Sequence, residues 1–505
     1  MKQRAIIIGS GMGGLSTACL LAKDGYEVHV FEKNEQLGGR LSVLKKDGFT
    51  FDMGPSWYLM PDIFEHFFAL MGERVETYLD LKHLAPSYRI FFKDDGSVRD
   101  FYADVARNRP TFEEMEQGSA QKLDAYLLKA KRSYDVSKQW FLYKNYDSIT
   151  DFFTWRTAIE GSRLPVIRSM HSYVSGQFVS EHVQKVLEYQ LVFLGTSPYQ
   201  APALYSLMNH IDFNVGVFYP MGGMGKLTEA LAAMAEKHQV AFHLNCPVHE
   251  ILVEEGRAVG VRLGDGTVVE ADLVVSNADI AFTEQHLLSA SAREHSDDYW
   301  NSRVMSPSAY LLYLGVKGKI PQLLHHNLIF CQDWKQNFDE IFAEPAWPSD
   351  PSIYVSMTSA TDPTVAPPDH ENIVVLVPIA ADLRYTPADL ARYEAKILAT
   401  IAETMKIEDF QQRIVSKTTF CVKEFAERYN SFKGSALGLA HTLRQTAVFR
   451  PNNISKKVKD LYYVGANTNP GIGVPMCLIS AELVLKRIKG IKDDQALPED
   501  VRIAE

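Results

Sequence analysis

The sequence has few cysteines, no long apolar run and no metal-ligand spacing. No CxxC pair occurs, and the five cysteines stand far apart, at Cys19, Cys246, Cys331, Cys421 and Cys477. An odd number at wide spacing argues against a disulfide framework or a zinc site, so we expect no metal and a reducing cytoplasm. No stretch reaches the roughly 18 apolar residues of a membrane-spanning helix. The apolar run after Arg4 is too short for a signal peptide.

Signatures of other enzyme classes are also missing. The run from Gly434 to Gly438 has its serine at the wrong position for a GxSxG nucleophile, and His249 lacks the second histidine of HExxH. The pair His325 and His326 stands alone, and we expect it in a surface turn. The net charge of −10 argues against nucleic acid as a partner, because nucleic-acid-binding surfaces are basic.

The first 32 residues have the pattern of a dinucleotide-binding βαβ unit. Residues 5–8 are apolar and mostly β-branched, residues 9–14 form a GxGxxG turn, residues 15–24 have helical composition, and residues 26–31 form a second strand. A lone GxGxxG is a weak signal, but the strand before it and the helix after it agree with a nucleotide site.

Each position in this turn has a physical task. Gly9 permits the tight turn, Gly11 lets the backbone approach a pyrophosphate, and Gly14 lets helix and strand pack closely. The helix N-terminus offers unpaired N–H groups to the phosphates. Glu32 ends the second strand and can accept hydrogen bonds from a ribose hydroxyl, which disfavours a 2′-phosphate. FAD and NAD therefore both fit better than NADP.

Gly38, Gly39 and Arg40 follow the ribose acid, where an NAD site needs no such residues. They resemble the GG[RK] extension of the flavoprotein family that includes amine oxidases, protoporphyrinogen oxidases and carotenoid desaturases. In that family the arginine approaches the pyrophosphate, so the resemblance implies FAD.

Residues 47–56, DGFTFDMGPS, resemble the DGFxFDxGP segment of bacterial carotenoid desaturases. The resemblance implies that Gly54 and Pro55 place backbone beside the flavin ring. Residues 219–225 resemble the P-x-GG-x-G segment of the same family, and residues 245–248 resemble one of its central strands, with Val248 against the adenine.

The resemblance continues to the end of the chain. Residues 274–279 resemble another central strand, and residues 461–466 with 470–475 resemble the C-terminal flavin clamp. One departure is Asn469, because family members often carry histidine there, which weakens any mechanism that needs an imidazole beside the flavin. The motif and the resemblance together place these residues at the cofactor: Gly9, Gly11, Gly13, Gly14, Glu32, Lys33, Gly39, Arg40, Gly54, Pro55, Ser56, Val248, Asn277, Gly465, Ala466, Gly473, Val474 and Pro475.

The resemblance implies an α/β fold with an α+β substrate part. The implied fold combines a Rossmann-like FAD-binding domain of the amine oxidase (GR2-type) superfamily with an inserted substrate domain and a helical, membrane-associated region. We assign residues 1–60, 216–285 and 456–492 to the discontinuous FAD-binding domain, 61–110 and 286–455 to the substrate-binding domain, and 111–215 to the helical region.

The implied activity is FAD-dependent desaturation of a long isoprenoid hydrocarbon, phytoene or a later carotene, by hydride transfer to flavin N5. The carbocation left beside existing double bonds has an acidic proton, so a strong base is less necessary. A helix beginning near Val474 would direct its positive end at the flavin. Asp151 and Arg156 could approach the flavin as catalytic groups, with a solvated helix face as the alternative.

The apolar runs 191–194, 203–208 and 215–219 suit the lining of a substrate tunnel. Residues 164–192 mix apolar and basic side chains and could lie in a membrane surface, where a hydrocarbon substrate is found. We therefore expect a cytoplasmic protein peripherally bound to the membrane. Because the GxGxxG unit occurs once, electrons should leave the flavin to oxygen or a membrane quinone rather than to a bound NAD(P).

Other functions remain open within this pattern. The substrate could be γ-carotene or dehydrosqualene instead of phytoene. More remote alternatives are a flavin amine oxidase, which would need an aromatic cage at the flavin, and a non-enzymatic prenyl-binding carrier of the Rab GDP-dissociation inhibitor type. The C-terminal clamp argues against the carrier.

Overall fold

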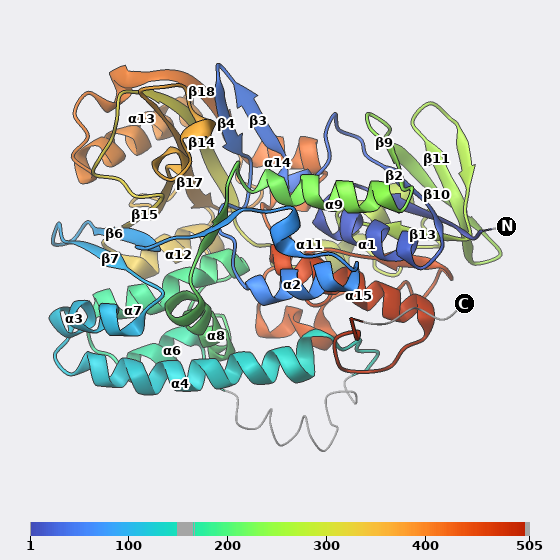
Figure 1. Cartoon of the computed structure of the whole chain (residues 1–505), viewed down its shortest axis with the longest axis horizontal. Helices are drawn as coiled ribbons and strands as arrows, with labels where there is room; N and C mark the ends of the chain where they lie inside the picture. The colour runs from blue at the N-terminus through green and yellow to red at the C-terminus, as the bar shows by residue number, and fades with distance from the viewer. Residues whose placement is uncertain (1, 149–164, 166, 500–505) are drawn as a thin grey trace.

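The computed structural model describes residues 2–148, residue 165 and residues 167–499 (Figure 1). Its first layer is a parallel sheet of order β19, β13, β1, β2, β9. In β1, Ala5 and Ile7 face one side and Ile6 and Ile8 the other, and all four are buried. Burial on both faces explains why the strand is continuously apolar. The strands are β1 (Arg4–Ile8), β2 (Glu27–Phe31), β9 (Ala241–His243), β13 (Leu273–Ser276) and β19 (Leu461–Tyr463).

Helices cover one face of this sheet and a small antiparallel sheet covers the other (Figure 1). Helix α1 packs between α9 and α15, and α2 packs on α15. A turn at residues 264–266 joins β11 and β12 of the antiparallel sheet. The elements are α1 (Met12–Lys23), α2 (Pro61–Leu70), α9 (Gly225–Lys237), α15 (Val474–Lys489), β10 (Val248–Glu254), β11 (Arg257–Leu263) and β12 (Val268–Glu270).

The second large element is a seven-stranded mixed sheet of order β18, β14, β17, β16, β15, β6, β7. In β14, Leu312 and Leu314 pack against helix α13, whereas Leu311 and Tyr313 pack against the hairpin β3–β4. The elements are β3 (Val43–Lys46), β4 (Phe49–Asp52), β6 (Tyr88–Phe92), β7 (Val98–Phe101), β14 (Ser308–Lys317), β15 (His326–Phe330), β16 (Ile353–Ser356), β17 (His370–Ile379), β18 (Ile414–Phe420) and α13 (Pro387–Thr404).

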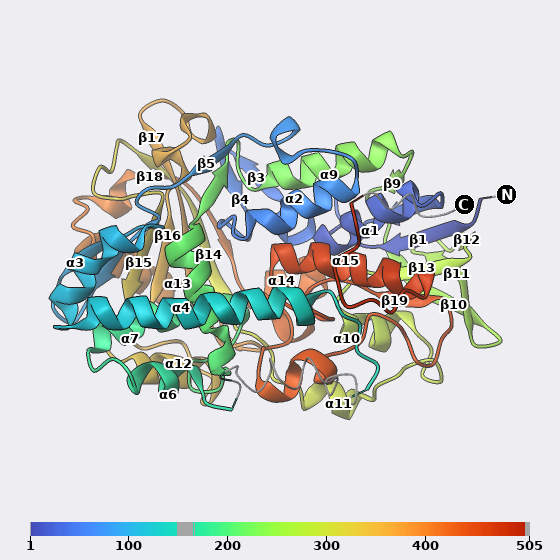
Figure 2. The same cartoon turned by 60° about the horizontal axis from the view of Figure 1, so that its bottom comes forward.

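A helical layer lies under β6 and β15, with the long helix α4 along one edge of the molecule (Figures 1 and 2). In α7, Val183, Val186 and Leu187 are fully buried, and the buried Lys185 donates to two backbone carbonyls. The expectation of a membrane-surface segment is therefore wrong for this helix, because its apolar side packs into the core. The helices are α3 (Val105–Met115), α4 (Ser119–Ser137), α6 (Met170–Ser175), α7 (Glu181–Glu188) and α8 (Leu207–His210).

Short elements complete the fold. Strands β5 and β8 pair with each other and connect the two large sheets. The α-helices and strands are β5 (Leu81–His83), β8 (Phe218–Pro220), α10 (Ile280–Phe282), α11 (Asp297–Asn301), α12 (Trp334–Phe342) and α14 (Val422–Tyr429). The π-helical turns are η3 (Lys138–Leu142), η7 (Ile211–Val215) and η8 (Thr283–Leu287). The 3₁₀ turns include η5 (Tyr189–Leu194), η13 (Leu443–Gln445) and η14 (Ala447–Phe449).

The division into domains stays a proposal. Helix α2 was assigned to the substrate-binding domain, yet its side chains share one core with α1 and α15. A boundary at residue 60 therefore cuts through a packed core. Strands β6 and β7 extend the seven-stranded sheet, although they precede its other strands by more than two hundred residues.

A buried polar cluster ties the helical layer to the seven-stranded sheet. The carboxylate of Asp212 in η7 accepts from Tyr88 Oη of β6 at 2.7 Å, from Tyr189 Oη at 3.2 Å and from Gln190 Nε2. Burial raises the pKa of Asp212 to about 7. The folded protein therefore binds this proton more tightly than the unfolded chain does.

We expect Asp212→Asn to change the pH dependence of stability. A carboxyl whose pKa is raised by folding stabilises the protein when protonated, and this contribution is lost as the pH rises from about 4 to about 7. The wild type should lose up to roughly 1.4 kcal/mol of unfolding free energy per pH unit across part of this range. The variant keeps an oxygen acceptor without the charge, so its curve should be flatter. Urea denaturation at several pH values measures this, with the exposed Asp298→Asn as control. Identical pH dependence in all three proteins would contradict the assignment.

Candidate cofactor and substrate site

A cavity of about 1360 Å³ lies among the parallel sheet, the seven-stranded sheet and the helical layer. A single small ligand usually occupies a pocket of roughly 300–1,000 Å³, so this cavity has room for two. Glycines and polar groups line it near β1 and the start of α15, and apolar side chains line it near η5 and β15.

The structure brings together almost all the described residues that the sequence assigned to the cofactor. Gly14 is the exception, because it packs helix against strand: a Cβ there would lie 2.1 Å from the carbonyl oxygen of Gly9. Asp151 and Arg156 lie outside the described residues. The residues that line the cavity are Gly9, Gly11, Gly13, Glu32, Lys33, Gly39, Arg40, Gly54, Pro55, Ser56, Val248, Asn277, Gly465, Ala466, Gly473, Val474 and Pro475.

The carboxamide of Asn277 occupies the centre of a glycine cradle. A Cβ would lie 2.8 Å from its Nδ2 if added to Gly11, and 2.7 Å from its Oδ1 if added to Gly13. A Cβ on Gly465 would lie 2.8 Å from the same Oδ1. Asn277 thus leaves no room for a side chain at these positions, and the glycines present bare backbone to the cavity, as a turn that binds a pyrophosphate requires.

Glu32 is held at the cavity by hydrogen bonds within the protein. Its Oε2 accepts from Ser10 N at 2.9 Å and Ser10 Oγ at 2.7 Å. Its Oε1 accepts from Asn34 N and Nδ2, both at 2.9 Å. The carboxylate therefore also fixes the glycine turn, a role that the sequence pattern did not indicate. A ribose hydroxyl would donate to the same carboxylate, either beside Ser10 Oγ and Asn34 Nδ2 or in place of one of them.

Arg40 has a donor without a partner in the part of the chain that the structure describes. Its Nη2 donates to Ser431 Oγ at 2.6 Å, and its guanidinium lies 5.5 Å from the centre of the Tyr429 ring. Its Nε is buried and unpaired. Burial lowers the pKa of Arg40, although Asp279 partly offsets this shift. An unpaired guanidinium donor beside the glycine turn fits a phosphate group.

Two helices direct uncapped N-termini at the cavity. Helix α1 follows Gly11 and α15 follows Gly473, and neither has a capping side chain or an acidic residue in its first turn. Residues at both N-termini line the cavity. Each end carries a partial positive charge and free N–H groups, so the cavity suits an anionic ligand. The helix expected near Val474 begins at that residue.

Sequence reasoning missed an imidazole at the C-terminal loop. His441 lines the cavity, and its Nε2 accepts from the backbone N–H of Ile472 at 3.0 Å. Its Nδ1 lies 2.6 Å from Tyr205 Oη. Burial and the nearby Arg450 hold the pKa of His441 well below its usual range. The loop therefore has an imidazole although residue 469 is asparagine, because His441 contacts it. No sequence spacing indicates this contact.

Arg450 also holds this loop in place, and no motif in the sequence indicated it. It is almost fully buried and donates to the carbonyl oxygens of Ala466 at 2.6 Å and Thr468 at 3.1 Å. Further bonds reach Leu439 O and Gln445 O. Burial lowers its pKa to about 10, so it stays charged at neutral pH.

The expectation that His325 and His326 form a surface turn is wrong. Both side chains are buried, and β15, which begins at His326, lies inside the sheet between β16 and β6. His326 Nδ1 lies 2.8 Å from Tyr354 Oη, and that hydroxyl lies 2.7 Å from Ser56 Oγ. His326 is therefore bonded to the cavity wall through Tyr354, whereas His325 Nδ1 lies beside Thr361 Oγ1, away from the cavity.

The far part of the cavity is apolar. Two of the runs predicted to line a tunnel do so, and the third, residues 215–219, does not. Trp57 contacts Tyr189 and Phe193 with ring centroids 6.4 and 5.4 Å apart. The lining from the predicted runs consists of Val192, Phe193, Leu194, Leu204, Tyr205, Leu207 and Met208.

Comparison with known proteins gives consistent matches along the chain. Residues 12–488 match the model of the flavin-containing amine oxidoreductases. The carotenoid 3,4-desaturase of Haloarcula japonica is 46% identical, over 94% of this chain and 96% of that protein. The zeta-carotene-forming phytoene desaturase of Myxococcus xanthus is 37% identical, over 96% of this chain and 94% of that protein. A solved oxidoreductase from Methanosarcina mazei shares the fold, with a TM-score of 0.65 at 18% identity over 96% of this chain and 100% of that one.

We expect Arg40→Met to weaken binding of FAD without destabilising the apoprotein. A lost charged hydrogen bond corresponds to about 1.5–3 kcal/mol, or roughly a ten- to hundredfold higher Kd. The apoprotein should keep most of its unfolding free energy, because Asp279, the acid that acts on Arg40, keeps its hydrogen bonds from Phe432 N and Asn467 Nδ2.

Fluorescence titration with FAD and with FMN tests this, since FMN lacks the second phosphate and should be affected less. The exposed Arg444→Gln serves as control and should bind FAD normally. Unchanged FAD affinity, or an equal loss of apoprotein stability, would contradict the assignment of Arg40.

Proposed function

This chain belongs to the flavin-containing amine oxidoreductases, among their carotenoid desaturases, and on that premise we propose that it binds FAD and dehydrogenates a long isoprenoid hydrocarbon in carotenoid biosynthesis. The observation that carries the proposal is one continuous cavity with a glycine-rich, anion-binding part and a long apolar part. The substrate is phytoene or a later carotene, with γ-carotene or dehydrosqualene as the alternative.

We propose FAD as the flavin because the glycine turn is built for a dinucleotide. The pyrophosphate would bind the N-terminus of α1 and Arg40, and the ribose would bind Glu32. Lys33 lies beside this acid and donates to Glu427 O and to Asn430 Oδ1 at 2.5 and 2.6 Å. The adenine would lie against Val248, at the start of β10.

When bound, the flavin supplies the hydride acceptor. The protein excludes water and holds the polyene in an apolar channel, which lowers the entropy cost of reaching a reactive geometry. The positive end of α15 favours negative charge placed before Val474. Arg450 holds the C-terminal loop expected to clamp the flavin (the clamp loop, residues 464–475), because it donates to the carbonyl oxygens of Ala466 and Thr468.

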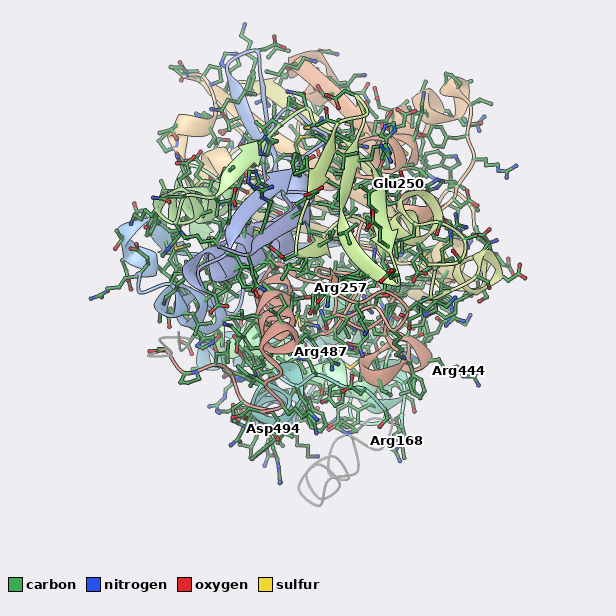
Figure 3. All side chains as sticks on the ribbon, turned by 90° about the vertical axis from the view of Figure 1, so that its right-hand side faces the viewer. Arg168, Glu250, Arg257, Arg444, Arg487 and Asp494 are labelled. Carbon is green, nitrogen blue, oxygen red and sulfur yellow. The ribbon has the colours of Figure 1, made fainter. Side chains whose placement is uncertain are left out.

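We propose that the cavity opens toward a bilayer. Leu443 and Phe449 line the cavity, and each is 53% exposed, which marks an opening at residues 443–449. Arg444 lies in this segment. Figure 3 shows Arg444 and Arg168 in the lower part of the view. Ile167 beside Arg168 is 94% exposed. Apolar residues beside basic ones suit an anionic membrane surface.

Among the described helices, none combines the length and apolar composition needed to cross a bilayer. Contact would then be peripheral, in the cytoplasm, through the opening of the cavity. A hydrocarbon substrate dissolved in the bilayer could enter directly. Electrons would leave the flavin to a membrane quinone or to oxygen, because the chain has one GxGxxG unit and the flavin occupies it.

The first test is turnover in liposomes that contain phytoene, and separately γ-carotene or dehydrosqualene. With FAD supplied and NAD(P)⁺ omitted, we expect new conjugated double bonds, seen as a red shift in absorbance, with oxygen or added quinone as acceptor. Strict dependence on NAD(P)⁺ under these conditions would overturn the assignment of the acceptor. A protein that binds the hydrocarbon but takes up no flavin would instead be a carrier.

The second test concerns the opening. We expect Leu443→Asp and Phe449→Asp each to weaken binding to anionic liposomes by about tenfold, corresponding to roughly 1.4 kcal/mol of lost apolar burial. Flotation assays measure this, and FAD content should stay normal. Val415→Asp is a matched control, because Val415 is 54% exposed but lies in β18 and does not line the cavity. Equal loss in the control would show that the effect is not specific to the opening.

A further inference from the structure

A chain of hydrogen bonds leads from the cavity wall to a buried imidazole. Ser56 Oγ and Tyr354 Oη lie 2.7 Å apart, and Tyr354 Oη lies 2.8 Å from His326 Nδ1. Ser56 and Tyr354 line the cavity, and Ser56 follows the glycine and proline expected beside the flavin. His326 has no exposed surface. The hydroxyl of Tyr354 therefore connects the cavity with a group that solvent does not reach.

The imidazole of His326 has an unused nitrogen. Its Nε2 is buried and has no hydrogen-bond partner among the described residues. Trp57 stacks on the ring at 4.7 Å with an interplanar angle of 21° and separates it from the cavity. A buried, unpaired nitrogen is costly for folding, by about 1–3 kcal/mol, and in a native protein it often reflects a functional requirement.

The surroundings keep both groups neutral. Burial, with a smaller effect from His325, holds the pKa of His326 well below its usual range. The ring of His325 lies 4.4 Å away, and the charges that act on it are Asp362 and Lys82. Burial raises the pKa of Tyr354 to about 12, and Asp52 adds to this shift. At neutral pH the pair is thus a phenol beside a free imidazole base.

We propose that Tyr354 and His326 accept the proton that the substrate loses during dehydrogenation. This inference rests on the proposed function, in which the substrate would lose a hydride to a bound flavin. The C–H bond next to the resulting carbocation breaks, and its electron pair forms the new C=C bond. The proton bonds to Tyr354 Oη while the phenol proton moves to His326 Nδ1, which leaves a neutral phenol and an imidazolium. Tyr354 is the catalytic residue, and His326 acts through it.

The other buried imidazole at the cavity is less suited to this task. His441 Nε2 accepts from the N–H of Ile472, so in the neutral ring Nδ1 carries the proton and donates to Tyr205 Oη. It cannot take a proton from Tyr205 without breaking the bond to the loop. His326 can hold its own proton on the unpaired Nε2, which leaves Nδ1 as an acceptor for Tyr354.

The test compares Tyr354→Phe and His326→Gln with His325→Gln as matched control. His325 is the neighbouring buried histidine with an equally unpaired Nε2, but its Nδ1 lies beside Thr361 Oγ1, at 2.8 Å, instead of a cavity hydroxyl. In the liposome assay we expect kcat to fall about a hundredfold in both relay variants, with KM and FAD content unchanged. The double variant should fall no further than the single ones, because the two groups act as a unit. His325→Gln should match the wild type.

The pH profile and NMR give independent readouts. The acid limb of kcat, where His326 becomes protonated, should be present in the wild type and in His325→Gln and absent from both relay variants. In apoprotein with ¹⁵N-labelled histidine, His326 should carry its proton on Nε2, and Tyr354→Phe should shift its Nδ1 signal.

Normal kcat in Tyr354→Phe, or a proton on His326 Nδ1, would overturn the relay while the dehydrogenation stands. If His326→Gln does not fold, the conservative Tyr354→Phe alone decides. No turnover by the wild type on any of the hydrocarbons would overturn the proposed function, and the relay with it.

Discussion

The contact of Asn277 with three glycines is the constraint on which the site depends. Gly11 and Gly13 come from the first turn and Gly465 from the C-terminal loop, and each would bring a side chain within 3 Å of the Asn277 carboxamide. The contact requires β1, β13 and β19 to lie side by side, which they do in the parallel sheet. It therefore joins parts of the chain that are more than four hundred residues apart and directs α1 and α15 at one cavity.

The cavity combines polar groups that the protein itself does not satisfy. Arg40 Nε lacks a partner at the glycine-rich part, and His326 Nε2 lacks one behind the apolar wall. Each such group lowers stability by about 1–3 kcal/mol. The remaining core is closely packed and apolar on both faces of the parallel sheet. Stability is thus supplied by the sheets and helices, and these two unsatisfied groups lie where a ligand or a proton would bind.

Burial also sets the charge of the groups at the cavity. It keeps the imidazoles of His441 and His326 neutral, whereas Arg450 remains a cation because it binds backbone carbonyls on the clamp loop. A cation near the loop and two helix N-termini favour negative charge in the cofactor part, whereas the described lining of the substrate part is mainly apolar. This separation suits an anionic cofactor beside a hydrocarbon.

The sequence alone determined the elements whose residues interact over short distances. The strand, glycine turn and helix at residues 5–24 and the helix start at Val474 follow from local patterns of apolar residues, glycine and proline. The positions of His441, His326 and α7 were decided by the tertiary structure. His441 reaches the clamp loop from 31 residues away, and His326 becomes buried only because β6, from early in the chain, pairs beside β15. Hydrogen-bond partners and burial depend on such long-range packing, which a local pattern does not encode.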